Sequence, residues 1–382
     1  MIYFDNGATT YPKPPRVAFA VSNAISNLGG NPGRGGHPMA MQAAQEVYNV
    51  RKMAAELFGL DAPENVIFTQ NCSHALNLVV YGLLQKGDRV VISDLEHNSV
   101  YRPLAWLAKQ GIIELEIVET SLVDPWQTLE SFEKALQTKT ELVLCTHASN
   151  VTGTVLPIKA ISKFAHQRGA LFAVDGAQSA GILEIDMKDM GIDFLCVPGH
   201  KGLYGPSGTG MLLCGCDSLL EPMMRGGTGS LSAQQEMPDF YPDRLECGTV
   251  NLCGICGLGQ GLRFIKNKGI KRIYAHDFDL INLFYQFMIR CNGVELYTPE
   301  PRYGWASSVL SFNLKGRSGE ETAQILSEKG FALRGGLHCA PLAHQKLGTL
   351  DRGTARIGVG AFNTPAQVLQ LCETIKKLQD TV

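Results

Sequence analysis

The sequence predicts an α/β protein with a large domain around a mainly parallel sheet and a second, smaller α+β domain. The chain has 382 residues, of which 45% are hydrophobic and 18% charged, so it can bury a large core. Short β-rich runs alternate with helical patterns over residues 16–262. The 41 glycines gather in short clusters between these segments, where the backbone turns sharply or approaches a ligand.

The expected strands of the large domain are short apolar runs at 66–69, 89–92, 141–145, 170–174 and 193–197. Candidate helices lie at about 73–85, 98–110, 127–137 and 157–168. Each of these helices is long enough for a right-handed crossover between parallel strands. Because the strand runs are apolar throughout, we expect helices to cover both faces of the sheet.

The last third of the chain follows a different pattern. We expect one long helical stretch from Gly254 to about Cys291, then a strand at 307–312 and a helix near 319–329. This order predicts a separate α+β unit. We therefore assign residues 16–262 to the large domain, and residues 1–15 and 263–382 to the small domain.

Composition excludes several classes of function. The formal charge is −2, from 34 basic and 36 acidic residues, which gives no electrostatic case for binding nucleic acid or an anionic membrane. No uncharged apolar run is long enough for a membrane helix, and the N-terminus lacks the pattern of a signal peptide. Eleven scattered cysteines, an odd number, indicate reduced thiols. We expect a cytoplasmic protein that acts on a small solute.

Polar residues follow the expected strands at the carboxyl edge of the sheet, where open α/β sheets bind ligands. After the strand at 66–69, the segment that contains Cys72 and Ser73 opens directly into a helix. Free N–H groups at a helix start bind anionic phosphate. A plain helix cap by Asn71 or Ser73 is the commoner explanation of such a segment.

Three further strand ends carry reactive side chains. Asp175 ends a central strand, and a charge buried there needs a partner. Lys201 follows His200 in a glycine-rich turn, where a lysine can lose its proton and act as a nucleophile. His97 follows the strand at 89–92, and its flat ring could stack on a planar ligand. Taken singly, such residues are usually solvated or structural.

Together these strand ends match the needs of one cofactor. Pyridoxal 5'-phosphate requires a phosphate site, a lysine for a Schiff base, a carboxylate for the pyridinium nitrogen and an aromatic plate. Asp175 would keep the ring nitrogen protonated, so that the ring accepts electrons from the substrate. Lys201 would hold the aldehyde until an amino acid displaces it. The combination predicts a pyridoxal-phosphate enzyme that acts on an amino acid.

Several motifs resemble those of one known family over nearly the whole chain, from Tyr3 to Thr364. The most specific ones lie at 175–178, 199–201, 246–251 and 334–340. The last, Arg-Gly-Gly-Leu-His-Cys-Ala, is similar to the Arg-x-Gly-x-His-Cys-Ala signature of group II cysteine desulfurases. The sequence thus resembles the cysteine desulfurases of the class V aminotransferase fold. The resemblance implies pyridoxal-phosphate fold type I and the conversion of L-cysteine to L-alanine.

The resemblance also implies how the cofactor and the substrate are bound. Lys201 matches the Schiff-base lysine, Asp175 the pyridinium partner and Gln178 the contact to the ring hydroxyl. The ring of His97 matches the stacking plate, and the phosphate neighbours are Cys72, Ser73 and His200. Thr249 matches a residue that reaches the phosphate of the other subunit, which implies a homodimer. Asn150 matches a position near the ring and the substrate, and Arg356 matches the arginine that binds the substrate carboxylate.

Cys339 is the expected sulfur acceptor. It follows Arg334 and His338 in a glycine-rich loop, where positive charge favours the thiolate and the backbone can move. In the mechanism that the resemblance implies, Lys201 removes the α-proton of L-cysteine and His97 carries a proton. The Cys339 thiolate takes the sulfur as a persulfide, from which it passes to an acceptor, a second protein being one candidate.

Three alternatives to this function stay open. A selenocysteine lyase would use the same pocket, a transaminase of the same fold has no use for Cys339, and a cofactor-free sulfur relay or scaffold would leave Lys201 idle. The sequence also departs from the family pattern. Pro198 stands where a serine often precedes Gly-His-Lys, and Cys72-Ser73 stands where two threonines are usual. The sequence does not identify the physiological sulfur acceptor, the preference for cysteine or selenocysteine, or the pathway.

Two cysteine pairs have close spacing, Cys214 with Cys216 and Cys253 with Cys256. A zinc or iron–sulfur site needs four such ligands, and no nearby histidine completes either set. Buried thiols are the simpler interpretation, and we expect no metal.

Overall fold

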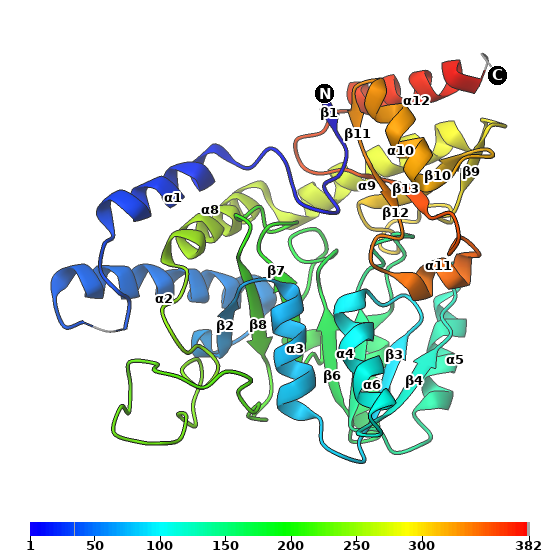
Figure 1. The fold of residues 1–382 in the computed structure, drawn as a ribbon. Coiled ribbons are helices and arrows are strands. Elements are labelled where there is room, and N and C mark those ends of the chain that lie inside the picture. Colours follow the sequence, from blue (N-terminus) through cyan, green and yellow to red (C-terminus); the bar gives the residue numbers. More distant parts are fainter. Residues whose placement is uncertain (34, 380–382) are drawn as a thin grey trace.

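The largest element of the computed structural model, which describes residues 1–33 and 35–379, is a seven-stranded sheet (Figure 1). Its order is β2-β8-β7-β6-β5-β3-β4. The strands are β2 (Val66–Thr69), β3 (Arg89–Ser93), β4 (Glu114–Val118), β5 (Leu142–Thr146), β6 (Leu171–Asp175), β7 (Phe194–Pro198) and β8 (Gly210–Cys214). Strands β3 to β7 pair in parallel, whereas β8 is antiparallel to β2 and β7. The predicted, mainly parallel sheet is confirmed.

Helices cover both faces of this sheet, because its strands carry apolar side chains on both sides. Val90 and Ile92 of β3 pack in one core with α3 (Cys72–Leu83) and α4 (Asn98–Lys109). Val91 points the other way. It packs in a second core with α2 (Pro38–Phe58), α5 (Pro125–Ala135), α6 (Ile158–Gln167) and α8 (Leu252–Lys268).

Three shorter or peripheral elements complete this part. Helix α1 (Pro15–Asn27) lies along α8, a 3-10 turn η1 (Pro63–Asn65) leads into β2, and α7 (Met187–Met190) precedes β7 (Figure 1). None of the helices in the described ranges combines the length and the apolar composition that a membrane span requires.

The C-terminal part forms a second layered unit around an antiparallel sheet of order β12-β13-β10-β9. Its strands are β9 (Val294–Leu296), β10 (Val309–Leu314), β12 (Arg334–Gly336) and β13 (Thr354–Gly358). The helices are α9 (Ile270–Met288), α10 (Gly319–Glu328), α11 (Pro341–Leu347) and α12 (Pro365–Gln379). At the other end of the chain, β1 (Ile2–Tyr3) pairs in parallel with β11 (Phe331–Ala332), so the first residues join this unit (Figure 1).

The helical stretch expected from Gly254 to Cys291 is in fact two helices. Helix α8 ends at Lys268 and α9 begins at Ile270, with Gly269 between them at a φ of 83°. Glycine adopts this conformation at little cost, so the chain turns there. The prediction of one continuous stretch was wrong at this residue. The domain boundary placed after residue 262 falls inside α8 and stays a prediction.

Candidate active site

A cavity of about 170 Å³ lies at the carboxyl edge of the central sheet. Among its lining residues are eight that the sequence singled out: Cys72, Ser73, His97, Asn150, Asp175, Gln178, His200 and Lys201. They follow β2, β3, β5, β6 and β7, whose carboxyl ends meet at this edge. The lining also includes Ser99 and Thr146, which sequence reasoning did not single out, and Asn71, which it named as a possible helix cap.

The helix start expected to bind phosphate is that of α3. The Asn71 side chain caps it by accepting a hydrogen bond from the N–H of His74 at 2.9 Å. The first turn contains no acidic residue, and the Ser73 hydroxyl lies 2.5 Å from that of Ser99. The cap and the polar cavity wall therefore coexist, so the two interpretations of this segment do not exclude each other.

Asp175, at the end of β6, is a buried carboxylate held by two donors. Its Oδ1 accepts hydrogen bonds from the N–H of Ala177 at 2.9 Å and from the Cys72 thiol at 3.5 Å. Burial raises the pKa of Cys72 well above its usual range, and Asp175 raises it further, so Cys72 stays a neutral thiol. These contacts fix the orientation of the carboxylate.

Lys201 and His200 follow β7 and are both perturbed by burial. Burial lowers the pKa of Lys201, Arg356 lowers it further, and Asp175 opposes the change. More of the lysine is then the neutral amine, the form that acts as a nucleophile or base. Burial, followed by Lys201 and Lys13, lowers the pKa of His200 to about 4, so its ring is neutral near pH 7.

His97 is the N-cap of α4 as well as part of the cavity wall. Its Nδ1 accepts a hydrogen bond from the N–H of Ser99 at 3.0 Å, so the ring proton of the neutral form lies on Nε2. Burial lowers the pKa of His97 to about 4. The capping role was not predicted, because histidine is not among the residues that usually mark a helix start.

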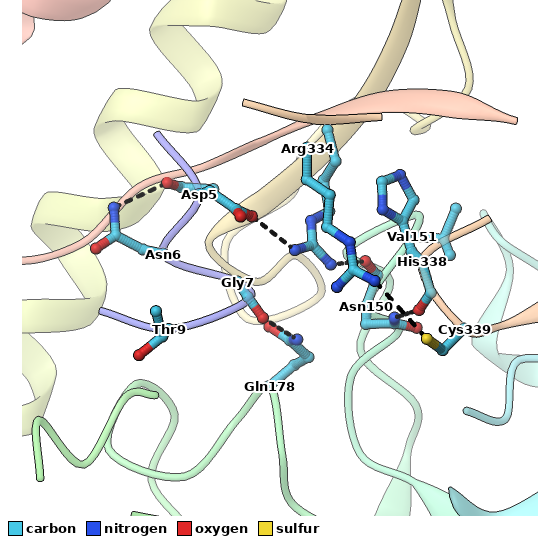
Figure 2. Close-up of polar contacts among 12 residues, drawn as sticks. Asp5, Asn6, Gly7, Thr9, Asn150, Val151, Gln178, Arg334, His338 and Cys339 are labelled. Carbon is cyan, nitrogen blue, oxygen red and sulfur yellow. Dashed lines mark hydrogen bonds and ion pairs between the residues drawn. The ribbon is translucent and has the colours of Figure 1, made fainter. Parts of the chain in front are cut away.

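Arg356, on β13, is 1% exposed and is not among the residues that line this cavity. Its Nη1 donates to the carbonyl of Asn150 at 2.9 Å, and its Nη2 pairs with Oδ1 of Asp5 at 3.1 Å (Figure 2). Its buried Nε has no hydrogen-bond partner in the described part of the chain. Sequence reasoning did not single out Asp5, and the only signal was that it lies next to Tyr3, where the family resemblance begins.

Cys339 is exposed in the loop between β12 and α11. Its Sγ lies 3.7 Å from Nη2 of Arg334 (Figure 2), and its carbonyl accepts from the N–H of Asn98 at 2.7 Å. His338 and Cys339 have φ values of 49° and 58°, a left-handed conformation that costs energy in residues other than glycine. The groove that Cys339 lines also includes Ser73, His97 and Ser99, so it shares a wall with the cavity.

Of the two residues expected to bring positive charge near Cys339, Arg334 does so and His338 does not. His338 is 2% exposed, and its Nε2 lies 2.9 Å from the carbonyl of Thr354. Burial lowers the pKa of His338 well below its usual range, and Arg356 lowers it further. The prediction that His338 contributes charge was wrong, because its side chain points into the core and is neutral near pH 7.

Gln178 and Thr249 differ in where they lie. Gln178 lines the cavity, and its Nε2 donates to the carbonyl of Gly7 at 2.9 Å (Figure 2). Thr249 is exposed, and its hydroxyl accepts a hydrogen bond from Nδ2 of Asn31 at 3.2 Å. The contact of Thr249 with a second subunit stays a prediction.

The four closely spaced cysteines are all free. Cys214 and Cys256 are buried, whereas Cys216 and Cys253 are half-buried. Over residues 1–33 and 35–379, no group of three or more histidine, cysteine, aspartate or glutamate side chains could hold a metal ion.

Comparison with known proteins places the chain in a family. The model described as aminotransferase class-V matches residues 2–371. A protein of Methanothermobacter thermautotrophicus named as a probable cysteine desulfurase is 35% identical over 99% of this chain and 94% of its own length. The apo cysteine desulfurase of Thermococcus onnurineus NA1 has a TM-score of 0.90 at 30% identity, covering 100% of this chain and 95% of that one. The Escherichia coli cysteine desulfurase CsdA, in its S-sulfonic acid form, has a TM-score of 0.87 at 25% identity over the same shares. The chain therefore belongs to the class-V aminotransferase family and has its α/β fold.

Proposed function

We propose that this protein is a pyridoxal-phosphate-dependent cysteine desulfurase that converts L-cysteine to L-alanine and takes up the sulfur on Cys339 as a persulfide. The observation that carries the proposal is that a half-buried lysine and a buried carboxylate lie in one cavity, next to the groove of an exposed cysteine. Lys201 and Asp175 line the cavity, and the groove of Cys339 shares a wall with it. The relatives named as cysteine desulfurases support the same reaction.

The side chains of the cavity suit pyridoxal 5'-phosphate. The start of α3 offers backbone N–H groups and the Ser73 hydroxyl to the phosphate, beside Cys72 and His200. Asp175 offers a fixed carboxylate to the ring nitrogen, and Lys201 offers an amine to the aldehyde. The proposed ring contacts are His97 on the face and Gln178 at the hydroxyl. When bound, the cofactor supplies a ring that accepts the negative charge developing at the substrate α-carbon.

Arg356 and Asn150 are the proposed substrate ligands. Arg356 donates one hydrogen bond to Asn150 and one to Asp5, and its remaining N–H groups, Nε included, are donors for a substrate carboxylate. Asn150 also donates to the carbonyl of His338 at 2.7 Å. One residue thus joins the carboxylate site to the loop that carries Cys339.

The remaining steps use Lys201, His97 and Cys339. Lys201, with its lowered pKa, takes the proton from the substrate α-carbon at Nζ. His97 is a proton carrier through Nε2. Cys339 Sγ attacks the substrate sulfur, so an S–S bond forms, the C–S bond breaks and its electron pair stays with the substrate carbon, which then takes up a proton. The balance is L-cysteine plus the Cys339 thiol giving L-alanine plus the Cys339 persulfide.

We also propose a homodimer, in which Thr249 from a second copy of the chain completes the phosphate site. Cofactor retention should then depend on the dimer, and dilution should release the cofactor. A monomer in sedimentation with full cofactor occupancy would refute the shared site. The sequence has eleven scattered cysteines, an odd number, which supports a reducing compartment such as the cytoplasm.

The function is tested by incubating the purified protein with pyridoxal phosphate and L-cysteine. We expect a yellow protein, L-alanine, sulfide when a thiol is added, and one extra sulfur atom on the peptide that carries Cys339 when it is not. A protein that stays colourless with the cofactor would instead be a relay or scaffold. Transfer of the amino group to a keto acid would identify a transaminase. A parallel assay with L-selenocysteine compares the two substrates.

A further inference from the structure

The proposed reaction makes no use of the ion pair between Asp5 and Arg356. Oδ1 of Asp5 lies 3.1 Å from Nη2 of Arg356. The Asp5 side chain is 21% exposed and that of Arg356 only 1%. A carboxylate of the chain therefore already contacts the guanidinium that is proposed to bind the carboxylate of the substrate (Figure 2).

Asp5 supplies a counter-charge that buried Arg356 needs. Burial lowers the pKa of Arg356, Asp5 is the strongest influence that raises it, and Arg334 lowers it again. Arg334 adds a second positive charge to this region, and the negative charge of Asp5 offsets it. A buried charge without a partner is destabilising, so Asp5 stabilises the charged guanidinium of Arg356 when no substrate is bound.

Hydrogen bonds hold the backbone on both sides of Asp5. On one side, the N–H and Nδ2 of Asn6 donate to the carbonyl of Gly358 on β13 at 3.2 and 3.0 Å. On the other, Thr9 Oγ1 and Lys13 Nζ donate to the carbonyl of His200 at 3.0 and 2.6 Å. Because the segment is tied to β13 and to the loop of Lys201, the Asp5 carboxylate stays near Arg356 when a second carboxylate enters.

We propose that Asp5 is a positioning residue that acts through Arg356: it is the resident counter-ion of the guanidinium, and its negative charge weakens the binding of substrate and product carboxylates. The inference rests on the proposed function, which assigns Arg356 to the substrate. Two carboxylates that share one guanidinium repel each other, and a site with little water screens that repulsion poorly. Asp5 thereby raises KM and helps L-alanine to leave.

The test of the competition is Asp5→Asn in the holoenzyme, because asparagine keeps the shape and the acceptor oxygen but not the charge. We expect L-alanine to bind about fivefold more tightly to this variant than to the wild type. Binding is measured by titration, with the absorption spectrum of the bound cofactor as the signal. Ethylamine, which is L-alanine without its carboxylate, should bind as to the wild type. KM for L-cysteine should fall by a similar factor, and kcat should not rise. Weaker binding of L-alanine, or an equal change for ethylamine, would overturn the proposal.

The counter-ion role has a test that needs no turnover. Asp5→Asn should lower the Tm of the protein without ligand, because Arg356 loses its partner. Adding Arg356→Gln should restore part of the loss, since neither charge then remains. An unchanged Tm, or a double variant whose loss is the sum of the two single losses, would count against it. If the wild type binds no L-alanine, the proposed function fails, whereas this stability cycle still reports on the ion pair.

Discussion

The cavity around Lys201 and the loop around Cys339 share a wall but are built in opposite ways. In the cavity, Asp175 is buried and Lys201 is half-buried with a pKa that burial lowers, and His97 is neutral because burial lowers its pKa to about 4. The Cys339 thiol, in contrast, is exposed, and its Sγ lies 3.7 Å from Nη2 of Arg334. The contrast separates two tasks. Cofactor chemistry needs buried groups with shifted pKa values, whereas sulfur delivery needs a thiol that an acceptor can reach.

The largest expected effect comes from the buried region. Lys201→Ala should lower alanine formation by about 1,000-fold or more, because the side chain is proposed both to bind the cofactor and to move the α-proton. Borohydride reduction of the wild type followed by peptide mapping should place the cofactor on Lys201. Lys13→Met is the matched control, because Nζ of Lys13 also contacts this loop, at the His200 carbonyl. In that variant the label should still be on Lys201. A label on any other lysine contradicts the assignment.

The exposed region should show a large effect with the cofactor left intact. Cys339→Ala should slow desulfuration of L-cysteine by roughly 100-fold or more, which is about 2.7 kcal/mol of barrier. The yellow colour should remain, and a measurable fraction of selenocysteine cleavage should survive, because selenium leaves carbon with less nucleophilic help. Cys216→Ala removes a half-buried thiol elsewhere and should change neither rate. Near wild-type desulfuration by the Cys339 variant would mean that another group accepts the sulfur.

A smaller effect should separate the charge near Cys339 from the thiol itself. Arg334→Ala should slow alkylation of Cys339 by iodoacetamide about fivefold near pH 7, because the guanidinium attracts a negatively charged sulfur. Arg334→Lys should recover part of the rate. His338→Gln serves as the comparison, since His338 is buried and neutral near pH 7 and should contribute no charge. A larger loss of rate from His338→Gln than from Arg334→Ala would mean that His338 does contribute positive charge at Cys339.

The smallest effect on activity is expected at Glu96, a buried carboxyl beside His97. Burial raises the pKa of Glu96 to about 8 from its usual 4.5. The folded chain therefore binds more protons than the unfolded chain between these values, and stability should fall as the pH rises from about 5 to about 8. In Glu96→Gln this fall should be smaller, with activity near pH 7 within about twofold of the wild type. Urea unfolding at the two pH values checks this, with exposed Glu119→Gln as the control.

Residues at strand ends could be predicted from the sequence, and contacts between distant segments could not. Lys201 and Asp175 were found because apolar runs mark the strands, and because the carboxyl ends of parallel strands meet. Asp5 was not predicted, because its partner Arg356 lies 351 residues away in the sequence and a contact over that distance gives no local pattern. The neutrality of His338 also escaped, because burial depends on packing that a motif does not reveal. The strand β8 was also not predicted, and its antiparallel direction depends on its pairing with β2 and β7.

The long reach of the N-terminal segment has a consequence for biosynthesis. Asn6 donates to the carbonyl of Gly358, 352 residues further along the chain, and β1 pairs with β11. During translation, the first residues leave the ribosome long before β11 and β13 exist to bind them. The guanidinium of Arg356 can therefore meet Asp5 only after the 351 residues that separate them in the chain have been made. A nascent chain can therefore build the central sheet before the Asp5–Arg356 pair exists, so the proposed substrate site is completed after the sheet.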